Sequence, residues 1–371
     1  MSAEQAVRAY LDRIVGDGVV GAIGLVEDAD GLVCLTAGRL SVDGPPMPSD
    51  AIIRIQSMTK TVTAVAALRL VEAGRLSLDD SVSTWLPELA DPRVLRTPES
   101  TLDDTVPLAR PITVRHLLNL TSGHGIAEGT PYYEGQVSAG VDAGPEPVDR
   151  GADAWLAALA TLPLFHQPGE GWLYHHGYML TGILIGRLTG RPYGDHLADD
   201  VFAPLGMVDT GFWAHDPARL PAAYRLEDDG PVETEPAGAG HYAGAPGFDV
   251  AHGELVSTAS DYLRFARMLR DRGLSDGVRY LSADSVAAIT SDQVPAEAKT
   301  PHSFGADMWQ GGSWGYGVFV EGSGRYGWSG GQGTDYSVDP ASGRITMLLT
   351  QVEMGPKTWG AITGFRDVLA G

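Results

Sequence analysis

The sequence predicts an α/β fold in which one sheet is built from both ends of the chain and a helical region is inserted between them. Two observations support this prediction. Short β-branched and apolar runs occur near both ends, and the middle of the chain alternates between helical periodicity and loops. One sheet that takes strands from both ends is the simplest assembly of such a pattern.

The N-terminal part is expected to begin with a helix and a hairpin. Residues 3–15 have the apolar spacing of an amphipathic helix. Residues 19–26 and 32–36 are predicted strands, and Asp28-Ala-Asp-Gly31 between them is typical of a hairpin turn. The β-branched run at residues 52–55 is a further extended segment, and it leads directly into a helix.

That helix is predicted to end at Gly74, because apolar residues keep helical spacing up to a glycine in the position where helices commonly stop. Residues 76–89 hold a short helix or turn, and Thr113 is expected to cap a helix that runs to Leu120. Residues 127–153 are rich in Gly, Pro and acidic residues and lack periodicity. We therefore expect a long surface loop there, a candidate lid over a site.

The second half of the chain is predicted to return from helices to strands. Helices are expected over residues 153–162, over about a dozen residues before Gly190, and over 257–270. Residues 214–253 are predicted to form a second loop-rich segment. The remaining expected elements are strands at 315–321, 334–339 and 345–351 and a final helix at 359–369.

The junction between the extended run and the first long helix carries the sequence Ser57-Met-Thr-Lys60. Residues three apart share a helix face, so the serine hydroxyl and the lysine amine can meet. The positive end of the helix dipole disfavours an ammonium ion, so we expect a lowered pKa for Lys60. A neutral amine beside a serine hydroxyl is a general base beside its nucleophile.

Lysine usage strengthens this interpretation of Lys60. The chain has 26 lysines and arginines, of which only Lys60, Lys299 and Lys357 are lysines. Arginine keeps its proton in proteins, whereas a desolvated lysine can lose it. The first lysine of the chain therefore stands where a deprotonatable amine is useful. The alternative is a surface lysine at the start of a buried helix.

Composition excludes several classes of function. The net charge of −21 and the lack of a basic cluster argue against nucleic acid as a partner. The single cysteine, Cys34, permits no intrachain disulfide. Acidic residues interrupt the N-terminus early and the apolar runs are short, so we expect a cytoplasmic protein without a membrane span. We find no spacing typical of a metal site and expect no cofactor.

Four motifs in order carry a resemblance to a known family. They are Ser57-Met-Thr-Lys60, then Ile112-Thr-Val-Arg-His-Leu-Leu118 with Thr121-Ser-Gly123, then the Tyr174 segment that ends in Leu180-Thr-Gly182, and finally Leu255-Val-Ser-Thr-Ala-Ser-Asp261. Over about residues 50–371 the chain resembles the serine beta-lactamase and penicillin-binding-protein superfamily, in particular its class C-like carboxylesterases, often called family VIII.

The resemblance implies an α/β domain with an antiparallel-rich sheet flanked by helices, plus an all-helical lobe, with the active site in the cleft between them. On this basis residues 1–75 and 255–371 form the α/β domain. Residues 76–254 form the helical lobe with its long active-site loops, and the whole is one continuous unit.

The resemblance also assigns the remaining site residues. In the family's Tyr-x-Asn motif, Tyr174 matches the tyrosine, whereas His176 stands in place of asparagine. The family's third motif, Lys-Thr-Gly or His-Thr-Gly on an edge strand, is best matched by Trp328-Ser329-Gly330. Tryptophan thus replaces the cation, as it does in some esterases of the family.

The implied mechanism is acyl transfer through an acyl-enzyme. Ser57 attacks an acyl carbonyl, and Lys60 and Tyr174 share the proton transfers, with Lys60 favoured as the first base. The backbone N–H groups of Ser57 and Gly331 would form the oxyanion hole, and a water activated by Tyr174 would release the acyl group. His176 is expected to orient Lys60 or the substrate carbonyl, or else to face solvent. His175 is interpreted as structural.

The substrate-binding residues are expected to be His176, Trp328, Ser329 and Gly330. Because Trp328 offers an apolar face and one N–H donor but no charge, we predict a carboxylesterase for small uncharged esters. Lactam hydrolysis, cleavage of amides or D-amino-acid peptides, and acyl transfer to an acceptor other than water stay open.

Two other classes of function remain to be weighed. Gly327-Trp-Ser329-Gly-Gly331 satisfies the nucleophile-elbow pattern of α/β-hydrolases, but a strand is expected to follow it and the last histidine, His302, precedes it. A non-catalytic binding module on the same fold would not need the catalytic side chains, whereas this chain keeps Ser57, Lys60 and Tyr174.

Overall fold

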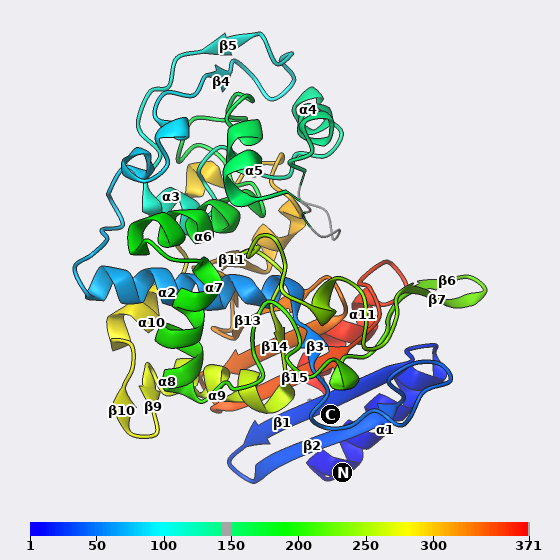
Figure 1. Ribbon diagram of the computed structural model, residues 1–371. Helices are drawn as coiled ribbons and strands as arrows, with labels where there is room; N and C mark the ends of the chain where they lie inside the picture. The colour runs from blue at the N-terminus through cyan, green and yellow to red at the C-terminus, as the bar shows by residue number, and fades with distance from the viewer. Residues whose placement is uncertain (143–147, 149, 370–371) are drawn as a thin grey trace.

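A seven-stranded antiparallel sheet organises the part of the chain that the structure, a computed structural model, describes, namely residues 1–142, 148 and 150–369 (Figure 1). Its order is β11-β12-β13-β14-β15-β1-β2. The strands are β1 (Gly21–Asp28), β2 (Gly31–Gly38), β11 (Gly312–Trp314), β12 (Phe319–Glu321), β13 (Tyr326–Gly330), β14 (Thr334–Asp339) and β15 (Arg344–Thr350). Because β1 pairs with β15, the prediction of one sheet built from both chain ends is confirmed.

Helices cover both faces of this sheet. Side chains of successive β1 residues point to opposite faces, and both sets are buried. Ile23 and Leu25 join the large core, whereas Ala22 and Val26 pack in a smaller core with α1 (Ala3–Gly16). α9 (Ala259–Arg270) covers the opposite face. The terminal α11 (Trp359–Thr363) and the 3₁₀ turn η9 (Gly364–Asp367) complete this part of the molecule.

The second part of the molecule is the helical lobe, which Figure 1 shows above the sheet. Its helices are α3 (Val114–Leu118), α4 (Pro131–Ala139), α5 (Ala152–Leu159) and α6 (His176–Thr189). The chain then continues through α7 (Tyr193–Leu197), the π-helical turn η4 (Ala198–Phe202) and α8 (Ala203–Leu205), which run in Figure 1 from the level of α2 (Thr59–Glu72) down to the level of α9. A short ladder of β4 (Val94–Leu95) and β5 (Thr105–Val106) accompanies the lobe helices. The 3₁₀ turns η2 (Val82–Thr84) and η3 (Pro87–Leu89) lie where a short helix or turn is expected.

Helix α2 (Thr59–Glu72) lies between the lobe and the sheet, as Figure 1 shows. Every residue from Thr59 to Leu68 is buried, so α2 has no solvent-facing side along this stretch. It contacts α6 of the lobe on one side and α10 (Ala283–Ile289) on another. The start of α2 is therefore fixed by packing from all directions.

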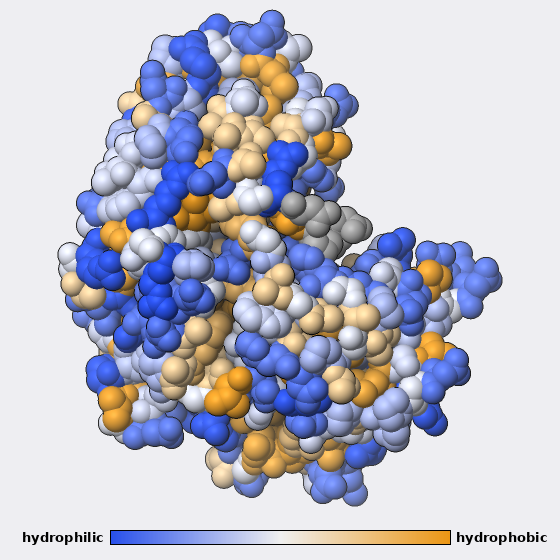
Figure 2. Space-filling view, viewed as in Figure 1, coloured by the Kyte–Doolittle hydropathy of each residue, from blue (hydrophilic) through white to orange (hydrophobic). Residues whose placement is uncertain are grey.

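Several connecting elements lie outside the main sheet and the lobe. β3 (Ile53–Arg54) pairs with β8 (Val256–Ser257), and β9 (Leu274–Ser275) pairs with β10 (Val278–Arg279). The remaining 3₁₀ turns are η5 (Pro217–Arg219), η6 (His241–Ala243), η7 (Ala296–Ala298) and η8 (Ala306–Gln310). On the face shown in Figure 2, hydrophilic residues predominate and hydrophobic ones occur in small groups. The proposed domain boundaries near residues 75 and 255 stay a prediction.

Three expectations about loops and ends need correction. The expected loop at 127–153 contains α4, which Thr130 caps and Pro131 opens; residues 143–147 and 149 of that prediction lie outside the described residues. The expected loop at 214–253 contains a hairpin of β6 (Ala223–Glu227) and β7 (Gly230–Glu235). The expected final helix is shorter, because it tightens into η9 after Thr363.

The turn between β13 and β14 packs directly against the segment that precedes α2. Thr334 Oγ1 donates a hydrogen bond of 3.1 Å to the Ile55 carbonyl. A Cβ atom at Gly330 would lie 2.2 Å from that same carbonyl oxygen, so only glycine allows the approach. At Gly331 an added Cβ would meet open space. This contact brings a strand of the C-terminal half against the first turn of α2.

We predict that Gly330→Ala lowers the free energy of unfolding by about 1–3 kcal/mol, because its methyl group overpacks the contact with Ile55. Gly331→Ala is the matched control and should change that free energy by less than about 0.5 kcal/mol. Urea unfolding of both variants measures the difference. Equal stability of the two variants would contradict the packing described above.

Candidate active site

Ser57 lies in the 3₁₀ turn η1 (Gln56–Met58), immediately before α2. The preceding strand is held in place by the Ile55 N–H, which donates to the Leu255 carbonyl at 3.0 Å. Gln56 has a positive φ of 47°, an uncommon conformation for a residue other than glycine. Its side chain donates to the Tyr242 hydroxyl at 3.0 Å. The strained turn places Ser57 at the junction that the sequence predicts.

Lys60 and Ser57 form the predicted contact. Lys60 Nζ lies 2.8 Å from Ser57 Oγ and donates a second hydrogen bond of 2.7 Å to the His252 carbonyl. The Lys60 side chain is fully buried, and burial holds the pKa of its amine well below the ordinary value. The sequence predicts the lowered pKa from the helix end, but desolvation is its cause. The lowered pKa favours the neutral form of the amine beside the serine.

Tyr174 lies on the other side of the same amine. Lys60 Nζ is 4.3 Å from the centroid of the Tyr174 ring. Burial raises the pKa of the Tyr174 phenol, and hydrogen bonding with Ser57 and Trp328 only partly opposes that rise. The phenol therefore keeps its proton at neutral pH and is suited to be an acid, whereas Lys60 is suited to be the base.

Trp328 on β13 is the partner of Tyr174. Its Nε1–H donates to the Tyr174 hydroxyl oxygen at 2.5 Å, and its ring meets Trp314 edge to face at 4.8 Å. β13 pairs with β12 only through Tyr326 and Gly327, so Trp328 lies on a locally free edge of the strand. The indole N–H thus holds the phenol in place, and the expected role of Trp328 in substrate binding stays a prediction.

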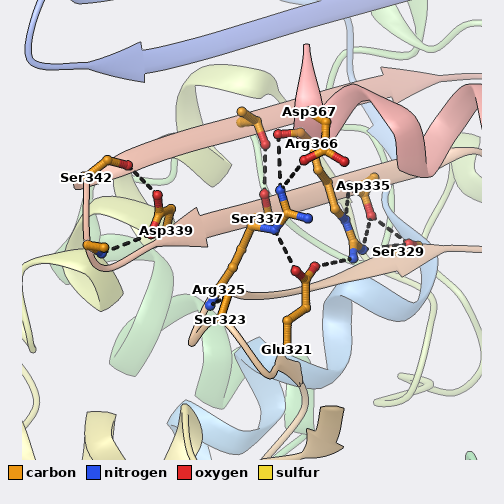
Figure 3. A network of polar contacts seen from close by, with 12 residues as sticks. Glu321, Ser323, Arg325, Ser329, Asp335, Ser337, Asp339, Ser342, Arg366 and Asp367 are labelled. Carbon is orange, nitrogen blue, oxygen red and sulfur yellow. Dashed lines mark hydrogen bonds and ion pairs between the residues drawn. The ribbon is translucent and has the colours of Figure 1, made fainter. Parts of the chain in front are cut away.

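The next two residues of β13 face different surroundings. The Ser329 hydroxyl donates to Asp335 at 2.6 Å and accepts from Arg366 at 3.2 Å (Figure 3). Gly330 packs against the carbonyl of Ile55, as described above. Because strand β14 and not a helix follows β13, the fold excludes a nucleophile elbow at Ser329. Gly331 is exposed in the turn beyond Gly330, and its role in an oxyanion hole stays a prediction.

The structure contradicts the role expected for His176, which was to orient Lys60 or the substrate carbonyl. The side chain is fully buried in the lobe, where Nε2 contacts the Val141 carbonyl at 2.7 Å and the ring packs on Trp155. Burial lowers the pKa of His176 to about 4. The hydrogen-bond partners of Lys60 are Ser57 and the His252 carbonyl, so His176 orients neither Lys60 nor a substrate in the cleft and faces no solvent.

His175, which the sequence led us to interpret as structural, is the histidine that borders the site. Its φ of 85° and ψ of −69° are those of a strained γ-turn. Its Nδ1 lies 3.1 Å from His252 Nδ1, and burial lowers the pKa of both imidazoles. His252, whose carbonyl holds Lys60, was missed because no local motif marks it.

The described residues contain no group of three or more His, Cys, Asp or Glu side chains that could hold a metal ion. Among the same residues, no helix is long and apolar enough to cross a membrane. The chemistry that the arrangement supports is built from a hydroxyl, a neutral amine and a phenol.

We predict that burial of Lys60 gives the stability of the protein a measurable pH dependence. The folded-state pKa of Lys60 is lowered, so between that pKa and the unfolded value of about 10.4 the unfolded chain binds the extra proton. The free energy of unfolding therefore rises with pH in this window, by at most about 1.4 kcal/mol per pH unit. Urea unfolding of the wild type and of Lys60→Met from pH 7 to pH 10 tests this. If the free energy of unfolding depends on pH in the same way in both proteins, the lowered pKa assigned to Lys60 is wrong.

Comparisons with known proteins agree with this fold. The family model "Beta-lactamase" matches residues 4–363. Protein Rv1367c of Mycobacterium tuberculosis is 37% identical over 350 residues, which cover 89% of this chain and 85% of that protein. Esterase EstB of Burkholderia gladioli is 32% identical over 354 residues, with coverage of 82% and 83%.

A solved structure adds similarity at the level of the fold. EstCE1, described as a hydrolase with promiscuous acyltransferase activity, superimposes with a TM-score of 0.83 at 23% identity and covers 99% of this chain and 98% of that one. From the match of the family model over nearly the whole chain, together with the relatives above, we conclude that this protein belongs to the beta-lactamase family of serine hydrolases.

Proposed function

We propose that this protein is a serine esterase that cleaves small uncharged carboxylic esters through an acyl-enzyme on Ser57. The observation that carries the proposal is the 2.8 Å contact between Ser57 Oγ and the buried amine of Lys60, whose pKa is lowered by that burial. A serine hydroxyl becomes a useful nucleophile when an adjacent base accepts its proton, and a lysine can do so only when it is uncharged.

Acylation follows from the positions of the three side chains. Ser57 Oγ forms a bond to the ester carbonyl carbon while its proton passes to Lys60 Nζ. The backbone N–H groups of Ser57 and Gly331 are assigned to the oxyanion. When the bond between that carbon and the alcohol oxygen breaks, Tyr174 gives its proton to the leaving oxygen. Tyr174 then recovers a proton from the Lys60 ammonium, so both groups return to neutral.

Deacylation reuses the same base. A water forms a bond to the acyl carbon, and Lys60 takes one proton from it. That proton returns to Ser57 Oγ as the bond between the acyl carbon and Oγ breaks, which releases the carboxylic acid. We assign the water to Lys60 and not to Tyr174, because burial raises the pKa of the phenol.

The preference for uncharged esters rests on Trp328. An indole at this position brings an N–H donor that is already bonded to Tyr174, and it brings no positive charge for a substrate carboxylate. A relative named as an esterase supports the same class of reaction. Other relatives are named as a penicillin-binding protein and an acyltransferase, so hydrolysis of lactams and acyl transfer to another acceptor are the alternatives.

We predict that Lys60→Arg lowers kcat/KM for ester hydrolysis by about 10²–10⁴-fold, because a guanidinium cannot act as a base at neutral pH. Lys357→Arg, at an exposed lysine that pairs with Asp228, is the matched control and should keep full activity. Steady-state kinetics with 4-nitrophenyl acetate measures both variants. Full turnover by a folded Lys60→Arg variant would contradict the proposed role.

A paired assay tests the reaction class. We expect turnover of 4-nitrophenyl acetate with little hydrolysis of a chromogenic cephalosporin, and a fluorophosphonate adduct on Ser57 in peptide mass spectrometry. Ser57→Ala should lose the adduct, whereas Ser329→Ala should keep it. Cephalosporin turnover without ester cleavage would make the protein a lactamase, and a protein with no adduct would be a binding module.

A further inference from the structure

A cavity of about 410 Å³ lies beside Trp328, between the β13 edge, the segment around η8 and the C-terminal helix. Five large apolar side chains form much of its wall. They are Phe304, Met308, Phe319, Trp328 and Trp359. Asp307, Ser329, Thr363 and Arg366 supply polar atoms at other points of the wall. A cavity of this size accommodates a ring system and not only a methyl or ethyl group.

The cavity borders on Tyr174 through two of its wall residues. The Phe304 ring stacks on the Tyr174 ring, with centroids 5.3 Å apart and planes 11° from parallel. The Trp328 N–H donates to the Tyr174 hydroxyl. In the mechanism proposed above, this hydroxyl protonates the oxygen of the departing alcohol. The group that is attached to that oxygen therefore lies at the Tyr174 side of the cleft.

The rim of the cavity exposes aromatic surface to water. Among the described residues with exposed large hydrophobic side chains, Phe304 and Trp359 are the two aromatic ones, at 41% and 56% exposure. Both line this cavity. Aromatic side chains that gather around a concavity and remain exposed are typical of a surface that an apolar ligand covers.

Arg366, the cation among the described wall residues, is already paired. It donates two hydrogen bonds to Asp335, at 2.8 and 2.5 Å, and lies 3.5 Å from Glu321 (Figure 3). Although burial raises the pKa of the Asp335 carboxyl, Arg366 and the Ser329 hydroxyl stabilise its ionised form. Glu321 also pairs with Arg325, which in turn pairs with Asp367. Two guanidiniums thus face three carboxylates, and this described cluster has no surplus positive charge for an anionic ligand.

We propose that this cavity binds the alcohol part of the substrate, and that this part is a bulky, apolar, uncharged ring. The inference rests on the proposed esterase function, because Tyr174 marks the leaving-group side only if it protonates the alcohol. It narrows the substrate class from small uncharged esters to esters of ring-containing alcohols. It also identifies Phe304 and Trp359 as specificity-determining residues and Glu321 as the residue that masks the charge of Arg366.

Kinetics with acetate esters tests the size preference. All acetates give the same acetyl-enzyme, so differences in kcat/KM report the alcohol part alone. Phenyl and 2-naphthyl acetate have leaving groups of similar acidity, and we expect 2-naphthyl acetate to be favoured by about tenfold or more. Trp359→Ala and Phe304→Ala should bring this ratio toward one, whereas Val208→Ala, at an exposed valine outside the cavity, should leave it unchanged. If Trp359→Ala instead impairs methyl 2-naphthoate, where the ring is on the acyl side, the proposal is wrong.

A second measurement tests the masked charge. The wild type should discriminate against 3-acetoxybenzoate, which carries a carboxylate on its alcohol part, relative to phenyl acetate. Glu321→Gln frees Arg366 from one carboxylate and should narrow this difference in kcat/KM several-fold. Asp276→Asn, in the turn between β9 and β10, removes an equal charge elsewhere and should leave the difference as it is. If Glu321→Gln and Asp276→Asn show the same difference in kcat/KM between phenyl acetate and 3-acetoxybenzoate, Glu321 does not mask the charge of Arg366.

Binding without catalysis separates this inference from the esterase proposal. Titration of Ser57→Ala protein with 2-naphthol, followed by naphthol fluorescence, should give saturable binding that Trp359→Ala weakens by about tenfold. If the wild type shows no ester turnover but Ser57→Ala protein binds 2-naphthol, the esterase proposal is wrong and the cavity remains a ring-binding site. Ester turnover without naphthol binding would overturn the cavity assignment alone.

Discussion

Burial of the Lys60 amine without a carboxylate partner among the described residues is the constraint on which the rest of this site depends. Its two hydrogen-bond partners are the Ser57 hydroxyl and the His252 carbonyl, and an aromatic ring covers it. A buried ammonium would need a counter-ion, so this pocket favours the neutral amine. The depth of α2 between the lobe and the sheet is what makes such a pocket possible.

The pocket is assembled from four distant segments, and two of them are strained. Ser57 and Lys60 come from η1 and α2, Tyr174 from the chain before α6, Trp328 from β13, and the carbonyl from His252. Gln56 and His175 adopt positive φ values, each beside a site residue. Such conformations persist only when surrounding contacts hold them, and here the Tyr242 and His252 side chains supply those contacts.

The parts of the site that could be predicted from sequence are local in origin. The spacing of Ser57 and Lys60 fixes their contact because both lie on one helical turn, and the Thr113 cap follows from a short-range hydrogen bond. His252 could not be predicted, because only the tertiary fold brings its carbonyl to Lys60. The assignment of His176 failed for a related reason. The γ-turn at His175 directs His175 to the site and sends His176 into the lobe. α4 and the β6–β7 hairpin were missed because turn-forming composition hid a cap at Thr130 and a turn at residues 228–229.

The absence of positive charge around the described site connects Trp328 to Lys60. A cation at position 328 would favour the neutral form of Lys60 by repulsion and would lower the pKa of Tyr174 by attraction. Tryptophan does neither, so burial alone must keep the amine neutral, and the phenol keeps its proton. The site therefore divides the two proton-transfer roles between residues with oppositely shifted pKa values, one base and one acid. In the neighbouring cavity Arg366 is paired with Asp335 and Glu321, so the described wall residues supply no free positive charge there either. The lack of an unpaired cation therefore affects both the pKa values of Lys60 and Tyr174 and the preference for an uncharged substrate.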